Sequence, residues 1–282
     1  MQKLGFSLQE HYALPMTQAV DLLADVGFDA VSLTWQRDGN AASVIRQARK
    51  HNLTVQSLHG PLRGMPAAWS PNPEIAGPLL QDLLQAATDC AKWEIPVLVI
   101  HPWNGVEYTF NGNALYFDHF DALVSCAENL GIVVAFENLE GAEYLAALMT
   151  RYAHSRSVGF CWDSGHERCY APSWDFLSLY GDRLVMTHLN DNLGISDPSG
   201  RLNGTDDLHL LPYDGTADWA QTLNRLKAAN RQEILNFELK IRPKGDRCKL
   251  DLYSSLPLRQ YFEAAYTAAC RAIEGYFEQE KA

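Results

Sequence analysis

This sequence lacks long apolar runs and closely paired cysteines. No uninterrupted apolar stretch approaches the ~18 residues that a membrane-spanning helix needs, and the first residues do not form the apolar core of a secretory signal peptide. Six cysteines occur among the 282 residues, but they do not show the short paired spacing of a structural zinc site or a disulfide framework. These absences predict a reduced, cytoplasmic protein without a membrane partner.

Positive charge is scarce as well. The chain has 23 lysines and arginines against 34 aspartates and glutamates, so its net charge at pH 7 is 23 − 34 = −11, and its pI is near 5.2. A negative field repels nucleic acids unless a local basic patch overrides it. The one dense basic stretch contains Arg242, Lys244, Arg247 and Lys249, and it fits either a solvated loop or a clamp on an anionic substrate. We therefore expect a small molecule, and not a nucleic acid, as the partner.

What the sequence does contain is a repeated unit of a short apolar strand followed by an amphipathic helix. Its 47% apolar and 20% charged residues are typical of a globular protein. The apolar and β-branched runs predict strands at residues 3–7, 30–35, 54–58, 96–100, 132–136, 158–162, 184–187 and 233–237. Helical periodicity predicts helices at residues 17–26, 41–51, 73–93, 115–130, 142–152, 174–180, 219–229 and 256–278.

Eight strand–helix units predict an α/β fold, namely a single (β/α)8 TIM barrel. An open doubly wound sheet usually has fewer strands and a glycine-rich first turn, which is missing here. No linker rich in Pro, Gly or Ser divides the chain, so we expect one domain over residues 1–282. A C-terminal helical extension is expected at about residues 254–280. Its aromatic residues would cover either the barrel or a neighbouring subunit, so a homo-oligomer is one alternative.

Imidazoles and carboxylates gather at the predicted strand ends. In a TIM barrel the chemistry lies at the C-terminal ends of the strands, where the βα loops converge. A buried strand end excludes such side chains unless they are paired or bind a cation, and five of the nine histidines occur in this region. The residues concerned are His59, His101, Glu137, Asp163, His166, His188, Asp207, His209 and Glu238.

Four of these residues belong to the last four strands, which are consecutive around a barrel. Glu137, Asp163, His188 and Glu238 can therefore converge on one ion. Several carboxylates with one imidazole suit a divalent cation such as Mn²⁺, Mg²⁺, Fe²⁺, Co²⁺ or Zn²⁺. Cys161 lies one layer deeper in the barrel and is expected to fill the core. A barrel that serves only as a scaffold or ligand sensor is the non-enzyme alternative, and it would be expected to lack such a set of ligands.

Tryptophans near the strand ends could stack on the apolar face of a sugar. Trp35, Trp69 and Trp103 occupy such positions, although packing within the loops is an equal alternative. Trp162 is different. Because neighbouring residues of a strand alternate in direction, Trp162 faces the helix layer if Asp163 faces inward.

At these positions the chain resembles the xylose isomerase-like TIM-barrel superfamily. This superfamily holds sugar isomerases and epimerases, relatives of inosose dehydratase and the endonuclease IV group, and the resemblance covers roughly residues 1–240. The segments that carry it are Phe136-Glu137-Asn138, Cys161-Trp-Asp163-Ser-Gly-His166, His188-Leu-Asn-Asp191, and Asp207-Leu-His209 through Gly215 and Trp219.

The resemblance to the sugar isomerase and epimerase branch implies a metal-dependent enzyme of carbohydrate metabolism. Glu137, Asp163, His188 and Glu238 would then hold one divalent ion. Glu137 and Glu238 would pass a proton between adjacent carbons of a ketose, sugar phosphate or hydroxyketone through a cis-enediolate. Further substrate contacts would come from His59, His101, His166, Lys240 and Trp103.

Two alternatives stay open within the same superfamily. Likeness to endonuclease IV implies a three-zinc phosphodiesterase, and its additional ligands would be His59, His101, His166, Asp207 and His209. The chain departs from that group in the loop at residues 36–41, which has one arginine and no aromatic wedge, and in its acidic charge. A lyase like inosose dehydratase is the other alternative.

Overall fold

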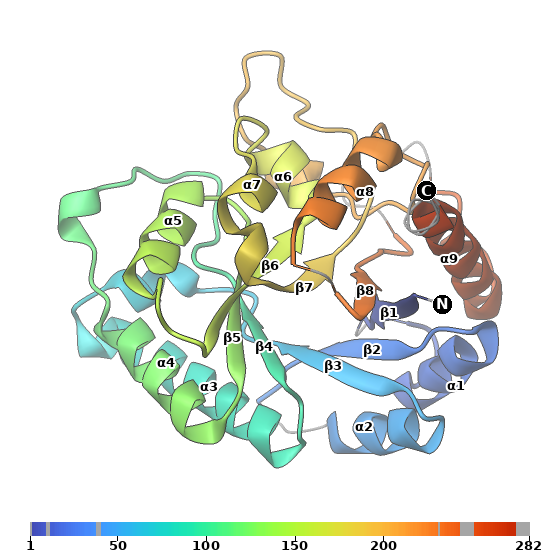
Figure 1. Cartoon of the computed structure of the whole chain (residues 1–282), viewed down its shortest axis with the longest axis horizontal. Helices are drawn as coiled ribbons and strands as arrows, with labels where there is room; N and C mark the ends of the chain where they lie inside the picture. Colours follow the sequence, from blue (N-terminus) through green and yellow to red (C-terminus); the bar gives the residue numbers. More distant parts are fainter. Residues whose placement is uncertain (1, 10–11, 38–40, 231, 243–250, 275–282) are drawn as a thin grey trace.

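A computed structural model describes residues 2–9, 12–37, 41–230, 232–242 and 251–274. This part of the chain forms eight parallel strands around a central axis, with helices outside them (Figure 1). Along the sheet the strands follow the order β7-β6-β5-β4-β3-β2-β1-β8. The predicted TIM barrel is thus confirmed. The strands are β1 (Lys3–Ser7), β2 (Ala30–Thr34), β3 (Thr54–His59), β4 (Val97–Ile100), β5 (Val133–Glu137), β6 (Val158–Asp163), β7 (Leu184–His188) and β8 (Ile234–Phe237).

The barrel closes between β7 and β8 through residues at and just beyond the end of β7. Leu189 forms an isolated parallel bridge with Phe237. Its N–H donates to the Asn236 carbonyl at 2.9 Å, and its carbonyl accepts from the Glu238 N–H at 3.1 Å. The Thr187 hydroxyl accepts from the Asn236 N–H at 2.9 Å. A side chain therefore replaces part of the backbone ladder at this joint.

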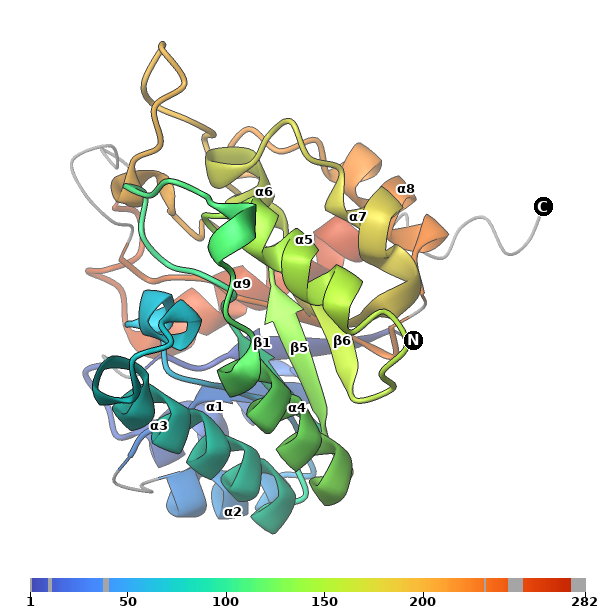
Figure 2. The same ribbon diagram turned by 90° about the vertical axis from the view of Figure 1, so that its left-hand side faces the viewer.

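The helices cover the outer face of the strands, and Figure 2 shows α3 and α4 side by side there. Gly131, in the left-handed region at φ 70°, ends α4 as predicted. None of the helices in the described part of the chain combines the length and apolar character that crossing a membrane requires. The α-helices are α1 (Met16–Val26), α2 (Ala41–Lys50), α3 (Pro73–Lys92), α4 (Asp118–Leu130), α5 (Ala142–Arg151), α6 (Ser164–Tyr170), α7 (Phe176–Tyr180), α8 (Trp219–Ala228) and α9 (Leu258–Ile273).

Two features of the elements differ from the sequence prediction. Four strands, β3, β5, β6 and β7, each end one residue later than predicted, and that last residue is a histidine or an acid. Helix α6 was not predicted. It begins directly after β6, with the Asp163 carboxylate accepting from the His166 N–H as its N-cap, so no loop separates the two elements.

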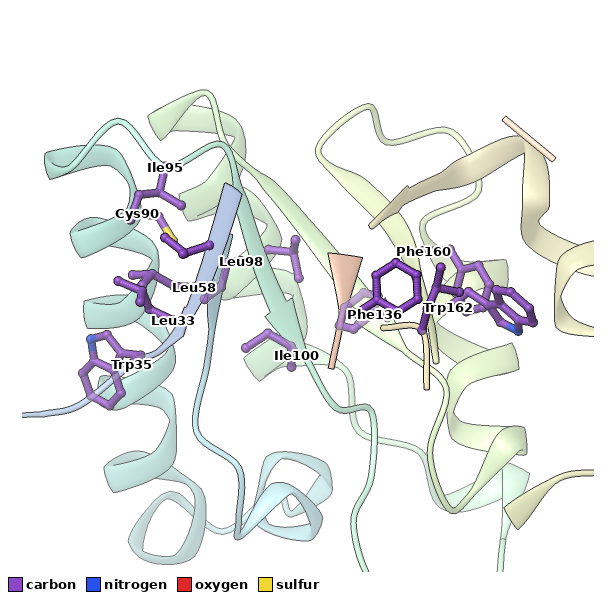
Figure 3. Close-up of a cluster of buried hydrophobic side chains, with 14 of the residues drawn as sticks. Leu33, Trp35, Leu58, Cys90, Ile95, Leu98, Ile100, Phe136, Phe160 and Trp162 are labelled. Carbon is purple, nitrogen blue, oxygen red and sulfur yellow. The ribbon is translucent and has the colours of Figure 1, made fainter. Parts of the chain in front are cut away.

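The main core lies between the strands and the surrounding helices. Figure 3 shows Leu58 and Leu98 pointing from the strands toward α3, and Phe136, Phe160 and Trp162 forming a second group of outward-facing side chains. A smaller cluster fills the barrel interior. It contains Val97, Val99, Ala135, Cys161 and Met186. The predicted inward position of Cys161 and outward position of Trp162 are both confirmed.

Helix α9 packs against the barrel's own first strand. The rings of Phe262 and Phe6 lie 5.3 Å apart, edge to face, and Tyr261 is buried beside them. These aromatic residues therefore cover the barrel itself. The alternative of a homo-oligomer stays a prediction. Residues 275–280 of the predicted extension lie outside the described residues, as do Lys244, Arg247 and Lys249 of the basic stretch.

Candidate metal centre

The candidate site is built from the ends of four strands. Glu137, Asp163 and His188 are the last residues of β5, β6 and β7, and Glu238 directly follows β8. Each offers one ligand atom, and these four atoms all lie within 4.8 Å of one another. The first three side chains are buried, whereas the Glu238 side chain is 21% exposed. The sequence prediction that these residues converge therefore agrees with their positions.

An irregularity in the β6–β7 register brings two of the four side chains level. Phe160 pairs with Leu184, and that register, continued without a break, would place Asp163 beside Thr187. A shift after Phe160 instead pairs Asp163 with His188. Because Thr187 and His188 face opposite sides of the strand, the shift places a carboxylate and an imidazole on the same side.

Two further groups of donors adjoin this one and share members with it. His59 Nε2 lies 3.1 Å from Glu137 Oε2, and His101 Nε2 lies 3.3 Å from the same oxygen. These three residues form one compact group, and Asp163, His166 and His209 form another. Asp207 Oδ1 contacts His166 and His209 at 3.2 and 2.7 Å. All nine predicted donors are therefore connected at the mouth of the barrel.

Charge at the centre is balanced between buried carboxylates and imidazoles. Burial alone would raise the pKa of Glu137, but His188, His101 and His166 surround the carboxylate and hold its pKa well below the usual range. Burial likewise opposes the charged form of His166, yet the carboxylates of Asp163 and Asp207 raise its pKa above the ordinary value. Protonated imidazoles thus neutralise the acids, and a divalent cation would do the same.

The donor set fits such a cation. Carboxylates and imidazoles are the usual ligands of the divalent first-row metals, and burial lowers the pKa of His101 to about 4, so its ring is neutral at pH 7. The neutral ring presents Nε2 to the other donors, 3.3 Å from Glu137 Oε2 and 3.2 Å from His59 Nε2.

Two asparagines hold Asp163 in place, and neither was predicted to act at the site. Asn138 donates to the Asp163 carbonyl and accepts from the Asp163 N–H, both at 2.8 Å. Asn190 Nδ2 donates to both carboxylate oxygens, at 3.1 and 3.0 Å. A Cβ on Gly165 would overlap Asn190 Oδ1. Both asparagines adjoin or nearly adjoin a ligand in sequence, which was the available signal.

Asp191 organises the long loop that follows β7. Its carboxylate is completely buried and accepts four hydrogen bonds of 2.7–3.0 Å, from the backbone N–H groups of Asn192, Tyr213 and Ala217 and from Trp219 Nε1. The loop that carries Asp207 and His209 is thereby fixed against the barrel. The motif between Asp207 and Trp219 is explained by this anchoring.

A cavity of about 910 Å³ opens above the donors. It is lined by His59, His101, His166 and Lys240, four of the five residues predicted to contact a substrate. Trp103, the fifth, is not among the lining residues. Its ring stacks on Tyr144 with centroids 4.3 Å apart, and its Nε1 donates to the Gly105 carbonyl at 3.1 Å.

The other two tryptophans also serve packing. Trp35 is buried in the core and donates from Nε1 to Asp89 at 2.8 Å, and Trp69 donates to the Pro102 carbonyl at 2.8 Å. Neither lines the cavity. The loop-packing alternative therefore holds for both rings. Sequence reasoning gave no role to several cavity residues that are polar: Ser57, Arg63, Glu140 and Tyr170.

The chain is similar to known proteins in sequence and in fold. A family profile described as "Xylose isomerase-like TIM barrel" matches residues 20–255. The uncharacterized protein y4fM of Sinorhizobium fredii is 34% identical over 174 residues, which cover 58% of this chain and 49% of the relative, so the match spans about half of that protein's length.

Two solved structures superpose over almost the whole chain. The IOLI protein with a binding zinc atom has a TM-score of 0.75 at 18% identity, with 98% of this chain and 100% of that chain covered. D-Psicose 3-epimerase with D-tagatose from Clostridium cellulolyticum H10 has a TM-score of 0.73 at 13% identity, with 97% and 99% covered. At these identities the likeness concerns the fold.

Proposed function

The chain belongs to the xylose isomerase-like TIM-barrel family, and from this we propose that it is a divalent-metal-dependent isomerase or epimerase of a small sugar or hydroxyketone. The observation that carries the proposal is the convergence of Glu137, Asp163, His188 and Glu238 beneath one open cavity. The solved neighbours include an epimerase with a sugar and a protein with a zinc atom. Both features agree with the chemistry that this donor set allows.

Glu137, Asp163, His188 and Glu238 would hold the ion, of the Mn²⁺, Mg²⁺, Co²⁺, Fe²⁺ or Zn²⁺ type. When bound, such an ion polarises a carbonyl and its neighbouring hydroxyl, which makes the adjacent C–H more acidic. The protein's own part is to place these four side chains and to exclude water from three of them.

Glu238 is the member of the four that suits proton transfer best. It lines the cavity together with His188, whereas Glu137 and Asp163 lie completely buried below. Burial would raise the pKa of Glu238, but His188 and His209 outweigh that effect, so its pKa lies below the usual range and its carboxylate can accept a proton. Glu137, whose Oε1 lies 2.9 Å from His188 Nδ1, would be the second proton carrier.

Deuterium incorporation tests this proposal. Protein reconstituted with Mn²⁺ is incubated in D₂O with D-fructose, D-tagatose, D-psicose or D-fructose 6-phosphate, and NMR follows the carbon next to the carbonyl. We expect incorporation with at least one of these compounds, and its loss in Glu238→Gln. As a control, Glu233→Gln removes an exposed carboxylate just before the start of β8, and it should leave deuterium incorporation unchanged. Absence of incorporation from every compound would refute the proposal.

Metal-dependent phosphodiester cleavage is the second candidate. It is favoured by one observation, that the donors form three adjoining groups which include His59, His101, His166, Asp207 and His209. These residues would hold several metal ions, which would supply an activated nucleophile and charge stabilisation for phosphodiester cleavage. Metal analysis separates the two candidates, because one equivalent supports the isomerase and three support the phosphodiesterase. Cleavage of an abasic-site duplex would reverse their order.

A further inference from the structure

Two arginines line the cavity. Arg63 belongs to the loop after β3, and Arg242 to the segment after β8, and both side chains are exposed at the mouth. Neither forms an ion pair with any residue that the structure describes. Hydrogen bonds from Ser254 are the main cause of the lowered pKa of Asp251, and the charge of Arg242 makes a smaller contribution to it. Two arginine forks are thus free to bind a ligand.

Arg63 and Arg242 are not alone in this respect, because Arg46 and Arg156 also form no ion pair with the residues that the structure describes. What distinguishes Arg63 and Arg242 is that both line the cavity. Because the guanidinium fork matches the geometry of a carboxylate or a phosphate, a ligand with such a group would supply what the protein itself does not.

The cavity changes in charge from its floor to its mouth. Glu238, Lys240 and Arg242 stand at alternate positions of one segment and all line the cavity. Lys240 lies between Glu238 and Arg242 in the sequence, and its Nζ is 3.4 Å from Asp207 Oδ2. The Cα atoms of Glu238 and Arg242, four residues apart, are at most ~14 Å from each other. A sugar of five or six carbons with a terminal anionic group, together with an arginine side chain, covers that span.

The cavity floor on the β1–β3 side carries hydroxyl groups. Ser7, Ser32 and Ser57 line it. Ser57 Oγ is buried and has no hydrogen-bond partner in the described structure, and the residue is only 1% exposed. A buried hydroxyl without a partner is costly, and a ligand hydroxyl would satisfy it. The β1–β3 side of the cavity therefore suits a polyol chain.

We propose that the substrate is an anionic sugar, whose phosphate or carboxylate binds Arg63 and Arg242 while its carbonyl end lies at Glu238. The assignment of the carbonyl end rests on the proposed function. The anion site itself rests on the unpaired arginines and the hydroxyl-lined floor, and neither depends on a metal being bound.

Calorimetric binding to Mn²⁺-loaded protein tests the proposal with three probes of one carbon skeleton. D-Fructose is neutral, D-fructuronate carries a carboxylate at C6, and D-fructose 6-phosphate carries a phosphate there. At least one anionic probe should bind roughly tenfold or more tightly than D-fructose, and Arg63→Gln and Arg242→Gln should each remove roughly tenfold of its affinity. D-Fructose binding should not change. Arg46→Gln, on the exposed face of α2 and outside the cavity, is the control of equal charge.

Each outcome separates the two claims. Preference for the phosphate or for the carboxylate identifies the source of the anionic group, and both support the proposal. Equal affinity for all three probes overturns it, as does an absence of binding or an equal effect of Arg46→Gln. Deuterium incorporation from D-fructose without anion preference would sustain the isomerase and reject the anion site. Arginine-dependent anion binding without incorporation from any ketose would do the reverse.

Discussion

His188 Nδ1 lies 2.9 Å from Glu137 Oε1, and both side chains are almost completely inaccessible to water. Burial would lower the pKa of His188, but Cys161, Glu137 and Glu238 together raise it well above the ordinary value. In the metal-free protein at pH 7 this imidazole is therefore protonated. A metal ligand must be neutral, so metal binding has to release that proton.

The first prediction concerns this proton. Mn²⁺ titrations in buffers of different ionisation enthalpy should show about one proton released per ion, and affinity should fall about tenfold per pH unit as the pH is lowered. Changing the surface residue His51, which pairs with Asp21, to Gln should leave the release unaltered. Binding that is independent of buffer and pH would contradict a site built on His188.

The second prediction concerns Asn190, which donates to both oxygens of the Asp163 carboxylate. Loss of a hydrogen bond that orients a ligand typically costs 10- to 100-fold in metal affinity. Asn190→Ala should therefore bind Mn²⁺ at least tenfold more weakly while keeping the circular dichroism spectrum of the parent. Asn113→Ala, on the exposed surface, should have no effect. Unchanged affinity in Asn190→Ala would mean that Asp163 needs no such support.

The third prediction compares two glycines. Gly77 lies within α3 with open space at its Cβ position, but it precedes Pro78, whose ring disfavours the helical conformation of a residue that has a Cβ. The gain of about 0.5–1 kcal/mol expected for Gly→Ala in a helix is therefore offset, and Gly77→Ala should change the free energy of unfolding little. Gly165 is the second residue of α6 and lies against Asn190, so Gly165→Ala must displace that side chain and should both destabilise the protein and weaken metal binding. Urea denaturation measures the first effect and metal titration the second. A stabilising Gly165→Ala would show that the contact yields easily.

The fourth prediction concerns the buried carboxylate of Asp191. Asp191→Asn would turn an amide N–H₂ toward two of the four donors, and the loss of charge-assisted hydrogen bonds should cost about 2–3 kcal/mol in the free energy of unfolding. Asp197→Asn, at an exposed turn with Ser199, should change it by less than about 0.5 kcal/mol. A similar small effect at both positions would refute the role of Asp191 as the loop anchor.

The fifth prediction is a pH dependence. Burial raises the pKa of Glu140, whose Oε2 has no hydrogen-bond partner among the described residues. The folded protein therefore keeps this proton to a higher pH than the unfolded chain does. The resulting stability is present below about pH 4.5, the unfolded value, and is lost as the pH rises through the folded pKa.

Glu140→Gln should accordingly be more stable than the parent at pH 8, by about 1–3 kcal/mol, and the gain should vanish toward pH 4. Unfolding by urea at both values measures it, with the exposed Glu128→Gln as control. A gain that is the same at both pH values would place the cause outside the titration of Glu140.

The sequence predicts the barrel and its nine donors because both depend on residue type and order. Histidines and acids at the ends of apolar runs are conspicuous, and strand direction alone brings them to one rim. Because polar side chains are unusual within strands, the predicted strands end one residue too early. His59, Glu137, Asp163 and His188 in fact form the last residues of β3, β5, β6 and β7.

Other features depend on packing that a linear pattern does not contain. The register shift that pairs Asp163 with His188 follows from one extra residue in β7, and no turn residue announces it. Trp103 follows a donor strand as a substrate contact would, but its ring finds Tyr144 instead. Arg63 is a lone cation in a loop, and only its place on the cavity wall distinguishes it from a solvated side chain.

The joint between β7 and β8 gives the donors a second significance. His188 stands on one side of that joint and Glu238 on the other, where a threonine hydroxyl substitutes for backbone pairing. An ion bound by both side chains would cross-link β7 and β8 at the joint where the backbone pairing is incomplete. Metal binding and the stability of the whole barrel would then be coupled, and the metal-free protein would open locally first between β7 and β8.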